Sequence, residues 1–239
     1  MIYVKSTPNN AGVAIHGDYL DFDELYDALH LIVGAEEEYP SYEAARMRVL
    51  GVCYDIRHAI MGDREVEYVD NGMDEDKMKR LSMITHKKNV YLVINVLWPE
   101  MLFVTMALNK FVQLNRKKCK HPQWDKTTAA VRKLQAAVAV GLQQTVSEAS
   151  YKRMINMMTS DYIWFDGYAT QYLDILNCRF LAMNREKRLK NIPTMAKRLA
   201  EQSQEYKEVK SEVIEAARMH NCSVYDIRPG LEYPEDIDW

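Results

Sequence analysis

The apolar positions of the first hundred residues follow a strand period in several short segments. Runs of β-prone residues at 2–5 and 13–16 flank the turn-forming segment 7–12, which predicts a hairpin. Residues 65–69 alternate between apolar and acidic side chains, as in a half-solvated strand. Residues 90–97 are apolar at nearly every position, which is typical of a central strand covered on both faces. These segments predict a small β-sheet.

A helical period separates these strand-like segments. The first helix is expected to open at a capping box formed by Asp21 and Glu24 and to stop at Gly34. A second helix is expected to open at Ser41 and to end before Gly62, with one continuous apolar stripe. The front of the chain is therefore predicted to mix helices with strands.

Helices are expected to dominate from residue 98 onward. Pro99 and Glu100 suit a first helical turn, because proline lacks an N–H that would have no partner there and a carboxylate complements the helix dipole. This helix is expected to run to about Lys117. After Pro122, four more helical segments are expected at 124–146, 148–158, 162–183 and 193–219. The remaining residues predict an irregular tail that docks through Tyr225, Tyr233 or Trp239.

These elements predict an α+β fold, in which a small N-terminal β-sheet with helices precedes an all-helical C-terminal half. A soft boundary is expected near residues 118–122. The expected parts are a mixed α/β region at 1–118, a helical bundle at 122–222 and an acidic tail at 223–239. The alternative, in which the helices pack on the sheet as one domain, stays open.

Length and composition are those of a globular protein. The 239 residues are 48% hydrophobic and include only 9 Gly and 7 Pro, without a repeat or a low-complexity segment. The first residues turn polar too quickly for a signal peptide, and the most apolar stretch, 129–146, is too short to cross a bilayer. Four scattered cysteines favour reduced thiols. We therefore expect a cytoplasmic protein without a membrane partner.

Charge divides the chain into three parts. Residues 1–76 carry 17 acidic and 5 basic side chains, residues 77–199 carry 7 and 22, and residues 200–239 carry 10 and 4. The formal net charge of −3 thus hides a basic middle between two acidic ends. Such asymmetry indicates either a polyanionic partner or charge pairing within the protein.

Asp55 and His58 are the strongest catalytic candidates in the sequence. They are three residues apart on a predicted helix, where side chains are neighbours, and a carboxylate beside an imidazole can orient a general base. His16 and Asp18 form a second pair at a strand end. A charged helix surface and a turn explain the two pairs more simply.

Common catalytic and cofactor motifs are absent from the sequence. It has no Gly-x-Ser-x-Gly elbow, no phosphate-binding loop and no dinucleotide fingerprint. The six histidines are isolated, and no Cys-x-x-Cys pair is present. We therefore expect no cofactor and no metal site, and a non-catalytic protein is favoured over an enzyme.

The strongest binding candidate is a cationic run at a predicted helix end, formed by Arg116, Lys117, Lys118 and Lys120. These cations could neutralise the phosphates of a nucleic acid, and a second cationic run lies at 185–190. The helix dipole alone also favours cations at a helix C-terminus. No known nucleic-acid-binding motif accompanies either run.

An aromatic cluster at 162–168, continued by Tyr172, is expected to start a helix that Asp161 caps. Core packing is the favoured interpretation of this cluster, because aromatic side chains stabilise a fold mostly through burial. An aromatic surface that stacks bases or docks a peptide is the alternative.

Three segments of the N-terminal half carry a recognisable pattern: TPNNAGV at 7–13, HGDY at 16–19 and RVLGVCYDIRH at 48–58. They resemble a family of uncharacterised bacterial proteins classed as a domain of unknown function. The resemblance covers roughly the first half of the chain. It implies a bacterial, cytosolic origin and no assigned activity or catalytic residue.

Three functional hypotheses follow. The first is a non-catalytic interaction or regulatory protein, whose acidic part packs on or competes for the basic part within one chain or a homodimer, or which binds another protein. The second is a nucleic-acid-binding protein that uses the run from Arg116 to Lys120. The third is a hydrolase-type enzyme built around Asp55 and His58.

Overall fold

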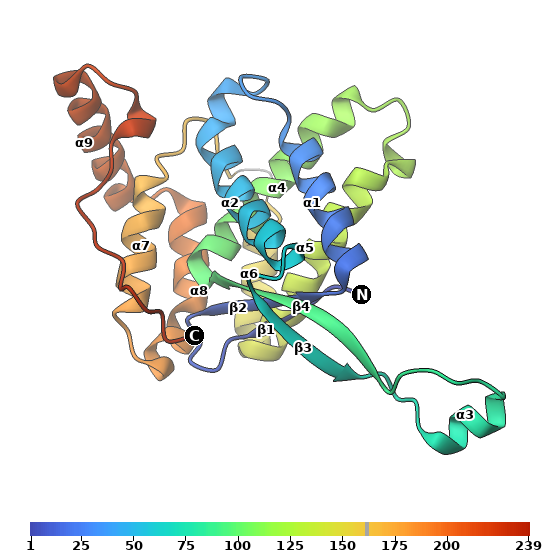
Figure 1. Ribbon diagram of the computed structural model, residues 1–239. Coiled ribbons are helices and arrows are strands. Elements are labelled where there is room, and N and C mark those ends of the chain that lie inside the picture. The colour runs from blue at the N-terminus through green and yellow to red at the C-terminus, as the bar shows by residue number, and fades with distance from the viewer. Residues whose placement is uncertain (161–162) are drawn as a thin grey trace.

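The computed structural model describes residues 1–160 and 163–239 and has an α+β fold (Figure 1). A four-stranded antiparallel sheet has the order β1-β2-β4-β3. Its strands are β1 (Tyr3–Ser6), β2 (Gly12–Gly17), β3 (Glu65–Asp70) and β4 (Lys88–Leu97). The predicted hairpin and both later strands are confirmed.

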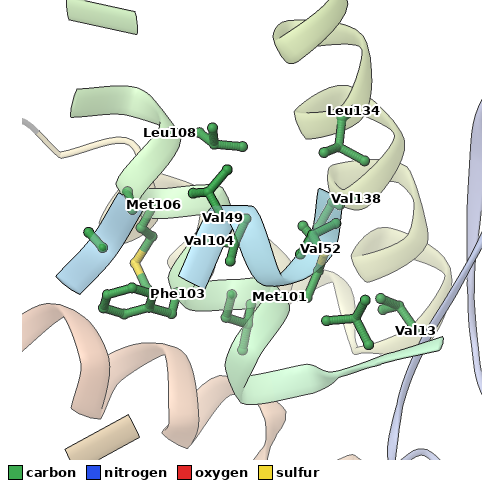
Figure 2. Close-up of a cluster of buried hydrophobic side chains, with 14 of the residues drawn as sticks. Val13, Val49, Val52, Met101, Phe103, Val104, Met106, Leu108, Leu134 and Val138 are labelled. Carbon is green, nitrogen blue, oxygen red and sulfur yellow. The ribbon is translucent and has the colours of Figure 1, made fainter. Parts of the chain in front are cut away.

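Helices of the front and middle of the chain cover one face of this sheet (Figure 1). They are α1 (Tyr19–Val33), α2 (Glu43–Ile60), α4 (Trp98–Lys118) and α5 (Lys126–Thr145), with short 3₁₀ turns η1 (Pro40–Tyr42) and η2 (Pro122–Trp124). The period of two places Ile15 of β2 opposite Ile94 of β4 on this covered face, where both are buried. Figure 2 shows buried side chains of α2, α4 and α5 that meet above the sheet.

The back of the chain is helical and continues from this core. It comprises α6 (Glu148–Met158), α7 (Gln171–Leu181), α8 (Arg185–Glu201), α9 (Gln204–His220) and the 3₁₀ turn η3 (Val224–Asp226). Phe103 of α4 packs edge-to-face on Phe165 and Tyr168, with ring centroids 5.2 and 5.1 Å apart. This aromatic packing confirms that much of the cluster before α7 is core, although Trp164 is exposed. The buried apolar residues of the front and back halves form one cluster.

Two predicted helix starts are wrong by several residues. Asp18, not Asp21, caps α1: the Asp18 side chain accepts from the Asp21 N–H, and the Asp21 side chain accepts from the Asp18 N–H. The helix expected at 162–183 begins only at Gln171, because Gly167 has a φ of +56° that interrupts it. The predicted cap Asp161 lies outside the described residues.

The helix expected at 193–219 is two helices. Asn184 caps α8 through a 3.0 Å bond from the Lys187 N–H, so Pro193 lies within the helix instead of opening it. Gln202, with a φ of +45°, ends α8 before α9 begins. The short helix α3 (Glu75–Leu81) was not predicted, because its exposed sequence has no apolar stripe.

Strands β3 and β4 extend beyond the body of the protein as a long hairpin with α3 at its tip (Figure 1). We call residues 66–92 the arm. The expectation that 90–97 is covered on both faces is correct only for its second half: Val93, Val96 and Leu97 are buried, whereas Val90 is exposed. The first half of β4 lies in the arm, which extends away from the helices that cover the second half.

Within the described part of the chain, no helix is long and apolar enough to span a bilayer. The division near residues 118–122 stays a prediction.

Candidate functional site

An open cleft of about 690 Å³ lies at one end of the sheet. It lies where the end of α2, the start of β3 and the junction of β4 with α4 meet α7 and the C-terminal tail. The residues that line it are Asp55, Asp63, Arg64, Glu65, Val93, Asn95, Val96, Leu97, Glu100, Asn177, Tyr233 and Trp239. We call it the acidic cleft.

Local sequence explains how two elements deliver their side chains to this cleft. Helix α2 ends at Met61, and the turn at Gly62, whose φ is +89°, leads directly into β3. This turn brings Asp63 and Glu65 close to Asp55 on the last turns of α2. At the other wall, α4 starts directly where β4 ends, so Glu100 lies in the first helical turn beside the sheet.

The C-terminal tail forms the third wall. The Trp239 carbonyl accepts a 3.0 Å hydrogen bond from the Asn9 N–H, and Asn9 Nδ2 donates to Asp238 Oδ1 at 2.6 Å. Arg188 Nη1 also donates to the Asp238 carbonyl at 3.2 Å. The tail therefore docks on the turn between β1 and β2. Trp239, one of the residues predicted to dock the tail, makes one of these contacts.

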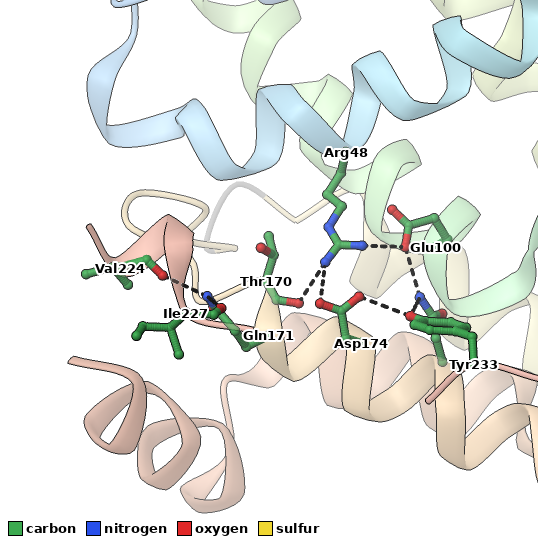
Figure 3. A network of polar contacts seen from close by, with 9 residues as sticks. Arg48, Glu100, Thr170, Gln171, Asp174, Val224, Ile227 and Tyr233 are labelled. Atoms are coloured by element: carbon green, nitrogen blue, oxygen red, sulfur yellow. Dashed lines mark hydrogen bonds and ion pairs between the residues drawn. The ribbon is translucent and has the colours of Figure 1, made fainter. Parts of the chain in front are cut away.

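A polar network anchors the inner wall of the acidic cleft (Figure 3). Arg48 of α2 donates to Asp174 Oδ2 at 2.7 Å and to Glu100 Oε2 at 3.4 Å. Asn177 Nδ2 donates to Glu100 Oε2 at 2.9 Å, and the Tyr233 hydroxyl donates to Asp174 Oδ1 at 3.0 Å. Four segments far apart in the sequence thus meet at one cluster of charges.

Burial changes the proton affinity of this network. It raises the pKa of Glu100, although the Arg48 guanidinium and the Asn177 hydrogen bond oppose the change. Burial also acts to lower the pKa of Arg48, but the attraction of Glu100 and Asp174 outweighs it and the pKa is raised. The pKa of Tyr233 is raised by burial and by the Asp174 carboxylate. Glu100 therefore gains a proton more readily than an exposed glutamate as the pH falls.

The described lining of the acidic cleft is strongly negative. Four carboxylates, Asp55, Asp63, Glu65 and Glu100, line the cleft with one cation, Arg64, which donates to Asp55 at 2.8 Å. Arg48, behind the lining, compensates part of the charge of Glu100. Among the described residues Glu65 forms no ion pair, and Asn177 Oδ1 is buried without a hydrogen-bond donor. The lining therefore offers acceptors and negative charge in excess of donors.

A second cavity of about 510 Å³ adjoins the first on the face of the sheet opposite the helices α1, α2, α4 and α5. The two share Glu65, Val93, Asn95 and Trp239. His16 lines the second cavity and stacks on Tyr3, with ring centroids 4.4 Å apart. Its Nδ1 lies 2.9 Å from Glu67 Oε2 without hydrogen-bond alignment, and burial lowers the pKa of His16 against the attraction of Glu67.

The structure places the four catalytic candidates in separate contacts. Asp55 bonds to Arg64, whereas His58 Nδ1 lies 3.3 Å from Asp63 on the same end of α2. Asp18 caps α1, and His16 lies across the sheet in the adjoining cavity. Asp55 and His16 thus line neighbouring cavities, but neither sequence pair is joined by a contact in the described residues.

The cationic run lies on another part of the molecule, at the end of α4. Lys118 pairs with Glu38 and lies over the Tyr39 ring. One cation of the run is therefore bound to the acidic front of the chain. Arg116, Lys117 and Lys120 are exposed and form no ion pair among the described residues. Elsewhere Lys133 pairs with Asp21 at 2.7 Å, which also joins the basic middle to the acidic front.

In the sequence, Glu100 was recognised only as a residue of the first helical turn. Asn177, Arg48 and Asp174 were not predicted to belong to a site. Asp174 and Asn177 are three residues apart in α7 and share a face of that helix, but nothing in the sequence pairs this face with α2 or α4. The residues meet because the helices pack, which spacing alone does not encode.

In the described residues, no group of three or more His, Cys, Asp and Glu side chains is arranged to hold a metal ion. The comparison with curated proteins gives no match, and neither does the comparison with solved structures. A family model, in contrast, matches residues 2–239 and extends the resemblance from the N-terminal half to nearly the whole chain. The chain belongs to the family described as Domain of unknown function (DUF6904).

Proposed function

We propose that this chain is a non-catalytic binding protein that takes a small cationic ligand, with an ammonium or guanidinium group, in the acidic cleft. The observation that carries the proposal is the excess of carboxylates over cations in a cleft of about 690 Å³. Cavities of roughly 300–1,000 Å³ are typical of small-molecule sites. The ligand class follows from the charge of the lining.

The hydrogen-bonding capacity of the lining supports the same class of ligand. Carboxylates accept hydrogen bonds only, and Asn177 Oδ1 is a buried acceptor whose own amide nitrogen already donates to Glu100 and Tyr233. A ligand rich in N–H donors would satisfy these acceptors. An anionic ligand would face unpaired negative charge and gain little from Arg64, which Asp55 already holds.

The aromatic walls fit a cation as well. Tyr233 and Trp239 line the cleft, and an aromatic ring face attracts an ammonium or guanidinium group by roughly 0.5–2 kcal/mol, depending on its exposure. The structure offers the cation both a charged wall and an aromatic wall. No described contact pairs Asp55 with His58 as a base and its orienting group, so binding is favoured over hydrolysis.

Titration calorimetry with arginine, putrescine, spermidine and, as anionic controls, succinate and AMP tests the proposal. We expect saturable binding of cations only, and mass spectrometry should recover the ligand unchanged. If neither cations nor anions bind, or if the anions bind equally well, the proposal fails.

A matched pair of variants assigns the binding to this cleft. Glu65→Gln removes one carboxylate that forms no ion pair in the described residues, and we expect about tenfold weaker cation binding. Glu212→Gln changes an exposed carboxylate of α9 outside the cleft and should leave the affinity unchanged. Equal effects of the two variants would place the binding elsewhere.

Nucleic-acid binding by the end of α4 is the second candidate function. The observation that favours it is the exposure of Arg116, Lys117 and Lys120 without ion pairs in the described residues. Cations that are already paired would contribute little to phosphate binding, so Lys118 is expected to contribute least.

Fluorescence polarisation with random DNA and RNA across a salt series tests this second candidate. Charge reversal by Lys117→Glu and Lys120→Glu should weaken binding and reduce the salt slope by about two units. The control reverses Lys207 and Arg218, two exposed cations of α9. An unchanged slope in the α4 variant, or no binding at low salt, would remove this candidate.

A further inference from the structure

The tip of the arm exposes several apolar side chains. Ile84 is 99% exposed, and Leu81 and Met83 beside it are also exposed. Lys79 and Arg80 of α3 lie next to them, exposed and without ion pairs among the described residues. A protruding tip that combines apolar and basic side chains is typical of a docking element.

A groove between α1 and α5 has the complementary character. It has a volume of about 400 Å³ and is lined by Leu20, Asp23, Glu24, Asp27, Ala28, Leu31, Lys126, Thr127 and Ala130. Leu20 is 73% and Leu31 62% exposed. Its three carboxylates form no ion pair in the described part of the chain. Along α1 the lining of the groove is therefore apolar at its two ends and acidic in its middle.

The arm cannot reach the groove of its own chain. Six residue pairs between β3 and β4, from Glu65 with Val93 to Asp70 with Lys88, hold the arm straight and directed away from the body. In Figure 1, α3 lies apart from α1 and α5 but on the same side of the molecule. Two such features on one side can contact each other reciprocally in a two-fold symmetric pair.

We infer that the arm of one copy docks in the groove between α1 and α5 of a second copy, and that the two arms exchange in a homodimer. Ile84 packs on Leu31 at one end of the groove, while Lys79 and Arg80 face the carboxylates in its middle. Each arm thus makes an apolar contact and, beside it, a contact between opposite charges. The apolar contact favours association, and the charges fix its orientation. The inference is independent of the acidic cleft and of its ligand.

Sedimentation velocity over a concentration series tests the inference on the full chain. We expect the wild type to form a dimer, and Ile84→Asp or Leu31→Asp to weaken it by about 100-fold or more, because each substitution acts at both symmetric contacts. Met219→Asp changes an equally exposed apolar residue of α9 and should leave the dimer intact. All four proteins should have the same circular dichroism spectrum, since each changed side chain is solvent-exposed.

Mixing the variants distinguishes reciprocal docking from any other association. The Ile84→Asp chain keeps an intact groove and the Leu31→Asp chain keeps an intact arm, so the mixture should form heterodimers through one intact contact although neither variant pairs with itself. Charge exchange, with Lys79→Glu and Arg80→Glu in one chain and Asp23→Lys and Asp27→Lys in the other, should likewise restore pairing. A wild type that stays monomeric, or a dimer insensitive to Ile84 and Leu31, would overturn the inference.

Discussion

Arg48 balances two carboxylates at the inner wall of the acidic cleft. Its guanidinium bonds to Asp174 and Glu100 and also donates to the Thr170 carbonyl at 3.2 Å. Removing one partner of a largely buried ion pair leaves the others without compensation, which typically costs several kcal/mol. The stability of this wall therefore depends on one side chain.

We predict that Arg48→Met lowers the free energy of unfolding by about 3 kcal/mol in urea denaturation. Arg57→Met is the control, because Arg57 is exposed on the same helix and has no ion pair in the described residues; it should change stability by less than about 0.5 kcal/mol. Equal losses for the two variants would contradict the assigned role of Arg48.

His16 makes the stability of the sheet sensitive to pH. Burial lowers its pKa, Glu67 opposes this effect, and Lys5 reinforces it, while Tyr3 covers the ring. The folded state then binds fewer protons than the unfolded state, so the stability contributed by His16 is present above the ordinary histidine pKa and is lost as the pH falls.

Unfolding measured between pH 7 and pH 5 should therefore show a steeper loss of stability in the wild type than in His16→Phe, by at most about 1.4 kcal/mol per pH unit. His220→Phe, at the exposed end of α9, should keep the wild-type slope. A His16→Phe slope identical to that of the wild type would show that other groups control this pH range.

At the scale of elements, the packing of β2 against the tail depends on a glycine. A Cβ on Gly12 would overlap the Val96 carbonyl oxygen and meet the Trp239 ring at 2.9 Å. Gly51, in contrast, lies on the exposed face of α2, where a Cβ meets nothing within 4 Å. The same substitution should therefore have opposite effects at the two positions.

Thermal unfolding of two alanine variants checks this prediction. Gly51→Ala should stabilise the protein by up to about 1 kcal/mol, because alanine has the higher helix propensity. Gly12→Ala should destabilise it by about 1–3 kcal/mol, because the strand pair or the tail must shift. A neutral Gly12→Ala would mean that neither the Val96 carbonyl of β4 nor the tail lies this close to Gly12 in solution.

At the scale of the whole molecule, the front and back of the chain share one apolar core. Phe103 packs on Phe165 and Tyr168 across the predicted boundary, and the Gly167 N–H donates to the Ser41 carbonyl at 2.7 Å. Elements that share a core unfold together in most small proteins. The two halves are therefore expected to behave cooperatively.

We predict one urea transition that coincides when followed by tryptophan fluorescence and by far-ultraviolet circular dichroism. Trp98, buried where β4 meets α4, gives the fluorescence signal a reporter in the front half beside the tryptophans at 124, 164 and 239, whereas the dichroism signal is dominated by helices of both halves. Two separated transitions would instead support a division into domains near residues 118–122.

The sequence by itself determined the elements whose signals are local. The strand period of 65–69, the proline at the start of α4 and the glycine stop of α1 were sufficient, because each depends on neighbouring backbone groups. The prediction failed where two residues carried the same local signal. Asp18 and Asp21 are each followed by an acidic residue three positions later, as in a capping box, but only Asp18 caps the helix.

Only the tertiary structure decided where the charges meet. The acidic ends and basic middle were visible in the sequence, but not that Glu38 would hold Lys118 while Lys117 stays free of ion pairs among the described residues. The acidic cleft combines α2, β3, α4, α7 and the tail, and the arm leaves the body because β3 and β4 continue past the helices that cover the sheet. Sequence spacing fixes which side chains share a face, whereas helix packing fixes which faces meet.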